Sequence, residues 1–214
     1  MRPTEREVDI DFVWHGIDDQ SGPAAIWLAD AAVGDRVVII GPDARSVYSA
    51  VGMDWRPGDA NEILLAGDET AVPAICGILE SLPEGVRAHA FIQVPTAQDA
   101  LPVAHNATTA LTWLARDSDP RSLDDAVRGW LASHRTAYAP ALTRGAQELD
   151  DIDVDVDLLW DSPEAGQGSF YAWLAGEAGV IKGLRRLLVS ETGIDRSRVA
   201  FMGYWRRGRA EAQE

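Results

Sequence analysis

Nine residues, AGDETAVPA (66–74), join the expected end of a strand to the expected start of a helix. Gly67 permits a tight backbone turn, Thr70 is a good helix N-cap, and Pro73 falls in the first turn, where its missing N–H costs little. A helix N-terminus that follows a parallel strand is where phosphates and dinucleotides bind, because its first N–H groups have no partner within the helix. The segment is therefore a candidate nucleotide-binding turn.

Two carboxylates in this turn support a different interpretation. Asp68 and Glu69 would repel a pyrophosphate, and the spacing is not the GxGxxG of dinucleotide-binding turns. Judged by residue types alone, helix capping explains the segment as well as nucleotide binding does.

A second strand–turn–helix junction has the sequence AGEAG (175–179), in which Gly176 and Gly179 flank Glu177 and Ala178. Many turns between a strand and a helix look like this, so the pattern is weak by itself. If both turns follow parallel strands, they open on the same carboxyl edge of one sheet and frame a crevice there. We therefore expect the two turns to meet.

The segment GPAAIW (22–27) places a Gly-Pro pair before a short expected helix. Such a helix start presents free backbone N–H groups, which suit an anion. His15 lies seven residues upstream of Gly22 and can donate to a ligand oxygen or act as an acid. The alternative is a structural histidine at the end of a strand.

Aromatic residues followed by arginines make up GYWRRGR (203–209). Trp205 can cover a planar ring, while fixed guanidinium groups can hold a carboxylate or an anionic chelate. Alternatively, Tyr204 and Trp205 belong to the core and the arginines only keep the surface solvated. The arginines are Arg206, Arg207 and Arg209.

Charge is distributed unevenly along the chain. The formal net charge is −15, yet residues 182–214 hold 8 of the 19 basic residues and 4 of the 34 acids. This basic end, which includes Lys182, suggests a site for an anionic ligand; a solvated helix face plus a tail is the alternative.

Composition also excludes several classes of protein. The acidic balance, with a pI near 4.6, argues against nucleic acid as a partner. No apolar run of 18 residues exists and the first residues lack the apolar stretch of a signal peptide, so no membrane insertion is expected. The one cysteine, Cys76, cannot form an internal disulfide, which fits a reducing cytoplasmic location.

Hydrophobic periodicity predicts an α/β fold that would position these segments. Short apolar or alternating runs predict strands over 8–13, 37–40, 62–67, 89–94, 111–116, 170–176 and 199–205. Apolar residues at helical spacing predict helices over 24–30, 72–82, 123–131 and 180–190. Their alternation over 62–205 indicates a parallel sheet with helices on both faces. The acidic stretch within 141–169 is expected to be a loop, and because it lacks the EF-hand spacing, no metal site is expected.

Five segments, taken in order, resemble the siderophore-interacting proteins, which are flavin- and NAD(P)H-dependent ferric-siderophore reductases distantly related to ferredoxin reductases. The segments are DFVWHG…GPAAIWLA (11–29), GDRVVIIGP (34–42), LLAGDETAVPAI (64–75), WLAGEAGVIKGLRRLL (173–188) and GYWRRGRAE (203–211). The similarity covers essentially the whole chain. No GxSxG, CxxC, P-loop or HExxH motif points to another enzyme class.

This resemblance implies a partial flavin-binding β-barrel over 1–58 and a ferredoxin-reductase-like NAD(P)H-binding α/β domain over 59–214. Hydride would pass from NADPH or NADH to FAD, and electrons would then pass to a ferric siderophore, which would release Fe(II). The residues implied to hold the FAD pyrophosphate are Gly22, Pro23, Ala24, Ala25 and Trp27. Those implied to line the nicotinamide nucleotide site are Gly67, Asp68, Glu69, Thr70, Pro73, Gly176, Glu177, Ala178 and Gly179.

The resemblance also implies the residues near the reacting groups. His15 would lie beside the flavin and Trp205 near its isoalloxazine ring, so these two are the expected catalytic residues. The cations implied to draw in the anionic chelate are Lys182, Arg206, Arg207 and Arg209.

Two features depart from the family pattern. Relatives usually carry an R-x-Y-T motif in an N-terminal half-barrel, whereas this chain starts at MRPTERE without it, and it has Ala25 where many relatives have serine. An incomplete barrel would leave sheet edges that a second copy, in a homo-oligomer, or a partner chain would cover. The alternative function is a non-catalytic protein that binds a nucleotide or a siderophore and has lost flavin binding.

Overall fold

The computed structural model describes residues 4–8, 10, 12–14, 22–39, 45–47, 54–145, 147, 149, 152–154, 156–163 and 168–207. The chain divides into two compact units, Met1–Ile39 with Gly208–Glu214, and Ile40–Arg207. The domain boundary expected between residues 58 and 59 stays a prediction.

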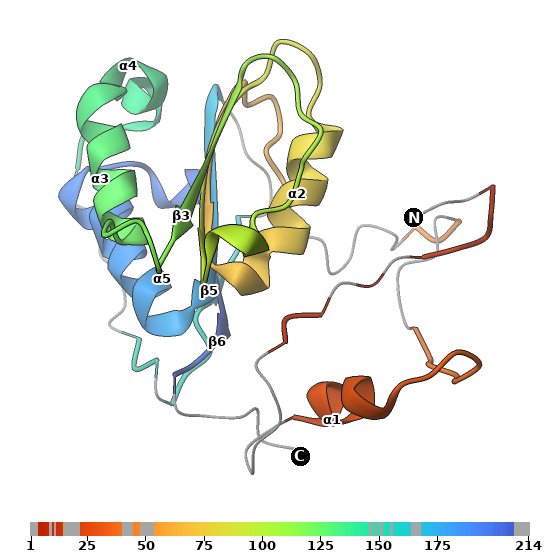
Figure 1. Ribbon diagram of the computed structural model, residues 1–214. Helices are drawn as coiled ribbons and strands as arrows, with labels where there is room; N and C mark the ends of the chain where they lie inside the picture. Colours follow the sequence, from red (N-terminus) through yellow and green to blue (C-terminus); the bar gives the residue numbers. More distant parts are fainter. Residues whose placement is uncertain are drawn as a thin grey trace. The chain divides into compact units, whose positions relative to one another are not determined.

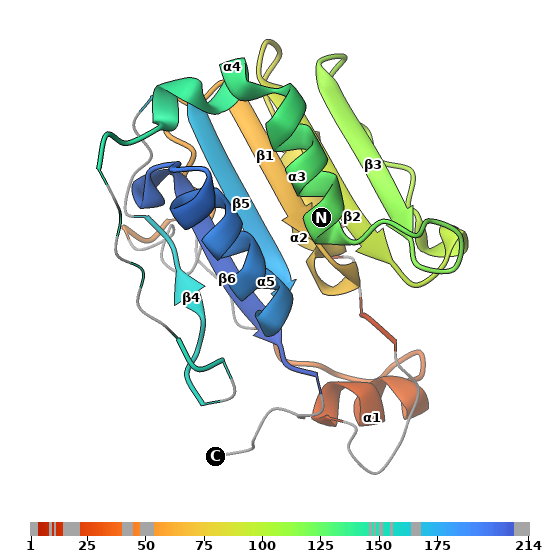
Figure 2. The same ribbon diagram turned by 90° about the vertical axis from the view of Figure 1, so that its left-hand side faces the viewer.

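The second unit contains a six-stranded sheet with the strand order β3-β2-β1-β5-β6-β4 (Figures 1 and 2). Its strands are β1 (Glu62–Gly67), β2 (Arg87–Val94), β3 (Thr109–Ala115), β4 (Trp160–Asp161), β5 (Phe170–Glu177) and β6 (Val199–Trp205). Every pairing is parallel except that of β4 with β6. The predicted parallel α/β sheet is therefore confirmed, and its five predicted strands over 62–205 lie within two residues of their expected positions.

Helices cover both faces of this sheet. Figure 1 shows α2 (Val72–Ser81) on one face, and α3 (Leu123–Ser133) and α5 (Ala178–Arg185) on the other. The shorter elements of the unit are α4 (Arg135–Tyr138), η1 (Glu69–Ala71), η2 (Ala97–Asp99), η3 (Ala139–Ala141), η4 (Arg186–Glu191) and η5 (Arg196–Arg198). The predicted helix over 180–190 is thus an α-helix that continues from Arg186 as a wider π-helical turn.

The central strand β1 shows why the sheet needs cover on both faces. All six of its residues are buried. Leu64 packs in the core beneath α3 and α5, whereas Ile63 and Leu65 pack in the core beneath α2. Each such fully buried side chain contributes about 1.5–3 kcal/mol. The continuous apolar run EILLAG is what a parallel strand covered on both faces requires.

The start of α3 is fixed by a capping box. The Ser122 hydroxyl accepts a hydrogen bond from the Asp125 backbone N–H at 3.0 Å, and Asp125 Oδ2 accepts one from the Ser122 N–H at 3.0 Å. These bonds satisfy two backbone donors that the helix leaves unpaired. They also fix the position of Leu123, which lines the pocket described below.

The first unit contains α1 (Pro23–Asp30), so the helical turn predicted over 24–30 is confirmed. Its described residues form no strand, and the strands predicted over 8–13 and 37–40 are therefore not seen in the parts of those segments that the structure describes. Val37, Val38 and Ile39 are 54%, 86% and 60% exposed, so this apolar run is not buried either. An apolar run favours an extended backbone, but a strand also needs a neighbouring strand for its backbone hydrogen bonds.

An aromatic and histidine cluster packs β2 against α3. Trp130 stacks on His134 at a centroid distance of 5.2 Å, and His89 meets the His134 ring edge-on at 4.7 Å. The pKa of His89 is lowered from 6.5, first by burial and then by the nearby His134, while Glu62 opposes the shift and Arg87 adds to it. His89 is thus held in its neutral form by packing.

We expect this cluster to make stability depend on pH. Because the pKa of His89 is lower in the folded chain than in the unfolded chain, the unfolded chain binds the extra proton as the pH falls below 6.5. The free energy of unfolding should therefore decrease between pH 7 and pH 5, measured by urea denaturation. His89→Gln should flatten this decrease, whereas His105→Gln, at an exposed position, should leave it unchanged. Equal pH dependence in wild type and His89→Gln would contradict the assignment.

Candidate functional site

The candidate site lies at the carboxyl edge of the sheet, where β1 and β5 end side by side. The two strands are paired in parallel, with Gly67 opposite Ala175. After β1 the chain turns toward α2 on one face, and after β5 it turns toward α5 on the other (Figures 1 and 2). Divergence of neighbouring connections opens a crevice outside the strand ends, the usual ligand position in such sheets.

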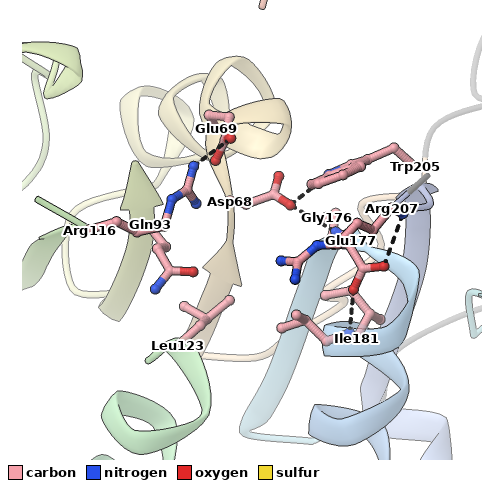
Figure 3. A pocket seen from close by; sticks show the side chains of 12 residues that line it. Asp68, Glu69, Gln93, Arg116, Leu123, Gly176, Glu177, Ile181, Trp205 and Arg207 are labelled. Carbon is pink, nitrogen blue, oxygen red and sulfur yellow. Dashed lines mark hydrogen bonds and ion pairs between the residues drawn. The ribbon is translucent and has the colours of Figure 1, made fainter. Parts of the chain in front are cut away.

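A pocket of about 200 Å³ fills this crevice (Figure 3). Its lining comes from the carboxyl ends of β1, β2, β3, β5 and β6 or the residues just after them, and from the starts of α3 and α5. Residues that line it include Asp68, Glu69, Gln93, Arg116, Trp205 and Arg207. A volume of this size is below that of typical drug-sized ligand sites, so it suits one end of an extended ligand.

Asp68 holds the turns around the pocket together. Its Oδ1 accepts hydrogen bonds from the backbone N–H of Thr70 at 2.9 Å and from the Thr70 hydroxyl at 2.5 Å. Its Oδ2 accepts from the Glu177 backbone N–H and from Trp205 Nε1, each at 2.8 Å (Figure 3). Asp68, 6% exposed, therefore ties the turn after β1 to the ends of β5 and β6 through one carboxylate.

Two positions at these strand ends must be glycine, because neighbouring atoms lie where a Cβ would be. Gly176 has φ +149°, and a Cβ there would lie 2.7 Å from Asp68 Oδ2. A Cβ on Gly67 would lie 2.5 Å from the Ala71 Cβ and 2.6 Å from the Ala175 carbonyl oxygen. Neither position has room for a side chain, so both glycines are needed for the strand ends to sit this close.

Glu177 caps the helix that begins beside the pocket. Its Oε2 accepts a hydrogen bond from the Val180 N–H at 2.9 Å, and its Oε1 lies 3.4 Å from the Arg207 N–H, a long contact (Figure 3). Ala178 is buried, and Gly179 lies next to the Glu177 carboxylate. The second turn is therefore stabilised by its own acidic residue, as the first is by Asp68.

Glu69 and Arg116 form an ion pair on the opposite side of the pocket. Arg116 Nη2 lies 2.6 Å from Glu69 Oε1. Glu69 Oε2 is buried and has no hydrogen-bond partner, and Gln93 lines the pocket nearby (Figure 3). An unpaired buried carboxylate oxygen is costly, so this side of the pocket can accept a hydrogen bond from a bound ligand.

The residue that caps the first turn is not the one that the sequence predicted. Asp68, not Thr70, is the N-cap of η1, and Thr70 instead donates to it. Asp68 takes this role because its carboxylate reaches the Thr70 N–H two residues on. Pro73 lies exposed in the first turn of α2, as expected.

The predicted cations have different surroundings, and of those that the structure describes, only Arg207 lines the pocket. Lys182 Nζ donates to the Ile152 carbonyl oxygen at 2.6 Å, and Arg206 Nη2 donates to the Asp157 carbonyl oxygen at 2.6 Å. Arg207 is exposed and lines the pocket. His15 and Arg209 lie outside the described residues.

Pocket residues from β2, α3 and α5 were missed by sequence reasoning, because only the packing brings them to the strand ends. They are Gln93, Leu123, Val180 and Ile181. A polar residue near the carboxyl end of a predicted parallel strand is a signal that could have identified Gln93.

The residues predicted to hold the FAD pyrophosphate lie in the first unit, at the start of α1. Gly22 is the N-cap, with extended backbone and no side-chain cap, and a Cβ there would meet nothing within 4 Å. Pro23 follows in the first turn, where it is preorganised for a helix start. The open, uncapped helix start, with the small residues Ala24 and Ala25, fits a phosphate bound by backbone N–H groups.

Comparison with known families identifies the chain. Residues 60–208 match the model described as "Siderophore-interacting protein", and residues 1–46 match "Siderophore-interacting FAD-binding domain". The chain belongs to the siderophore-interacting protein family. The sequence resemblance drawn from five segments is therefore confirmed.

Individual relatives of this siderophore-interacting protein include a ferric vibriobactin reductase, ViuB, of Vibrio cholerae, which is 28% identical over 98% of this chain and 63% of its own length. The uncharacterized protein Rv2895c of Mycobacterium tuberculosis is 30% identical over 96% of this chain and 62% of its own length. The chain thus spans a little under two thirds of the length of these relatives.

Solved structures show the same fold. SipS of Aeromonas hydrophila superposes with a TM-score of 0.62 and 27% identity, over 98% of this chain and 66% of that one. A siderophore utilization protein from T. fusca gives a TM-score of 0.56 and 26% identity, over 94% of this chain and 61% of that one.

Among the described residues, no helix is both long and apolar enough to cross a membrane.

We expect Gly67→Ala to disrupt the site through its backbone. The added Cβ meets a carbonyl oxygen and a neighbouring Cβ that cannot move away independently, so the free energy of unfolding should fall by about 1–3 kcal/mol. Urea denaturation measures this change.

Gly77→Ala is the matched control, because Gly77 is exposed in α2 and a Cβ there meets nothing within 4 Å. This substitution should raise the free energy of unfolding by about 0.5–1 kcal/mol. If both variants had the same free energy of unfolding, the close approach at Gly67 would not contribute to stability.

Proposed function

We propose that this chain is a reductase that passes electrons from NAD(P)H through FAD to a ferric siderophore and so releases Fe(II). The single observation that carries the proposal is the pocket at the joined ends of β1 and β5, closed by Trp205. Membership of the siderophore-interacting family and the reductase names of ViuB and the ferric acinetobactin reductase of Acinetobacter baumannii support it.

In this proposal the pocket receives the nicotinamide end of the coenzyme. Its size suits one end of a dinucleotide, with the remainder lying along the open carboxyl edge. Gln93 and the Glu69–Arg116 pair offer hydrogen bonds to the ligand. Trp205 provides a flat apolar wall against which a planar ring stacks.

FAD would be held through the open start of α1 by the segment from Gly22 to Trp27. When bound, the flavin supplies the chemistry that accepts a hydride and releases single electrons. His15 and Trp205 are the residues proposed to lie beside the flavin. The chain's task is to bind and orient the two reactants and to exclude water from between them.

The basic end of the chain would attract an anionic ferric chelate. Hydrogen bonds from Lys182 and Arg206 to carbonyl oxygens fix the positions of these two cations. The Arg207 guanidinium has no ion pair among the described residues and lies at the pocket. Fixed positive charges at a site raise the local concentration of an anionic substrate.

An anaerobic assay tests the proposal. Purified chain, free FAD and either NADH or NADPH are mixed, and loss of the oxidised flavin absorbance is followed; a ferric chelate and an Fe(II) trap are then added. We expect flavin reduction and Fe(II) formation that both require the chain and the coenzyme. Flavin reduction no faster than in a mixture without the chain would refute the proposal, and coenzyme binding without turnover would favour the non-catalytic alternative.

We expect Arg206→Glu to raise the KM for an anionic ferric chelate by about three- to tenfold at low ionic strength, because a fixed cation becomes an anion. The KM for NAD(P)H should change little, since Arg206 does not line the pocket. Arg135→Glu, an equal charge change at an exposed position in α4, is the control. Equal effects of both variants on the chelate KM would show that only net charge matters.

A further inference from the structure

The indole of Trp205 is fixed by a buried carboxylate. Trp205 Nε1 donates to Asp68 Oδ2 at 2.8 Å, across 137 positions of sequence. Figure 3 shows this bond at the pocket, with the indole extending from the end of β6 toward the turn after β1. A charge-assisted hydrogen bond from the indole N–H to a carboxylate adds a directional constraint on the ring to the constraints of packing.

All of the accepting capacity of Asp68 is used by the protein. A carboxylate has about four lone-pair sites, and Asp68 accepts four hydrogen bonds: two from Thr70, one from Glu177 and one from Trp205. A ligand in the pocket would therefore find no free acceptor on Asp68. Its chemical effect on a ligand has to pass through the groups that it holds.

A second indole–carboxylate pair in the same unit provides a comparison. Trp160 Nε1 donates to Asp54 Oδ2 at 3.1 Å, but Trp160 is 45% exposed and neither residue lines the pocket. Asp68 is 6% exposed. Because water competes less with the part-buried Asp68–Trp205 bond than with the exposed Asp54–Trp160 bond, the first should constrain its ring more strongly.

We propose that Asp68 is a positioning residue that acts through Trp205: it holds the indole as the wall against which the nicotinamide ring is placed. This inference rests on the proposed function, since it assigns Asp68 a part in coenzyme use. It also gives Asp68 a more specific role than the lining of the nucleotide site that the family resemblance implied.

The first experiment observes the Asp68–Trp205 hydrogen bond itself and needs no turnover. In chain labelled with ¹⁵N-tryptophan, Trp205→Phe identifies the Trp205 indole N–H resonance by its disappearance. Asp68→Asn should move this resonance and speed its exchange with water, because the amide places a donor opposite the indole N–H. Trp160→Phe should leave the Trp205 resonance in place. An unchanged Trp205 resonance in Asp68→Asn overturns the proposal.

The second experiment is a double-mutant cycle on coenzyme use. We expect Asp68→Asn to lower kcat/KM for NAD(P)H about tenfold, a loss typical of one charge-assisted hydrogen bond. The variant carrying both Asp68→Asn and Trp205→Phe should lose no more than Trp205→Phe alone, because Asp68 acts only through the indole that Trp205→Phe removes. Multiplied losses would show that Asp68 acts independently of Trp205 and would overturn the proposal.

Asp68→Ser is the second variant in case Asp68→Asn does not fold. Serine also caps a helix start, so η1 keeps its cap while the side chain becomes too short to reach the indole. It should give the same loss of kcat/KM and the same shift of the Trp205 resonance. Normal values for both in a folded Asp68→Ser variant would contradict the proposal.

Failure of the proposed function can be distinguished from failure of the positioning role proposed for Asp68. If wild-type chain binds NAD(P)H without turnover, the same cycle is measured with the dissociation constant of NAD(P)H, and coupling between the two residues still supports positioning. If wild-type chain binds no NAD(P)H, the role in coenzyme placement is refuted, whatever the indole resonance shows.

Discussion

The structure of the site depends on one buried carboxylate with four donors. Asp68 takes its hydrogen bonds from the turn after β1, the end of β5 and the end of β6. A buried carboxylate without donors would be strongly destabilising, so each of these segments is held to a position where it can donate. The glycines at 67 and 176 follow from the same constraint, because any side chain there would occupy the space that the close approach uses.

Around this carboxylate, the pocket follows from sheet topology. A parallel sheet whose neighbouring connections leave to opposite faces has a crevice at the strand ends, and here β1 and β5 are those neighbours. The apolar cores on the two faces fix the strands, and the capping boxes and N-caps fix where the helices begin. The pocket walls are therefore parts of rigid elements and of turns that those elements hold.

The sequence was sufficient for the five parallel strands and for α2, α3 and α5 of the second unit, because their signals are local. It missed α4 and the short strand β4 (Trp160–Asp161), which lies in the acidic stretch expected to be a loop and needs β6 as its partner. The apolar run of β1 and the helical spacing in α2 specify their own structure, and Ser122 marks the start of α3. The meeting of the two glycine turns also followed, since parallel strands share a carboxyl edge. The apolar run at 37–40 led to a wrong strand prediction. A strand needs a neighbouring strand to pair with, and a run of residues does not show whether one is present.

Other parts of the site depended on contacts that no local pattern contains. Asp68 appeared to be a repelling charge in a phosphate turn, and only the fold shows donors from residues 177 and 205 reaching it. Lys182 and Arg206 appeared to be free cations, yet both donate to carbonyl oxygens of the acidic stretch, at Ile152 and Asp157. Gln93 and Leu123 reach the pocket only through the packing of β2 and α3.

The sequence distance between Asp68 and Trp205 has a consequence for folding. Joining positions 137 residues apart closes a very long loop, and contacts of this kind form slowly because chain entropy opposes them. Trp205 ends the last strand of the sheet, so the pocket cannot be complete until β6 has docked. A ligand that binds only the completed pocket would stabilise the whole unit by mass action.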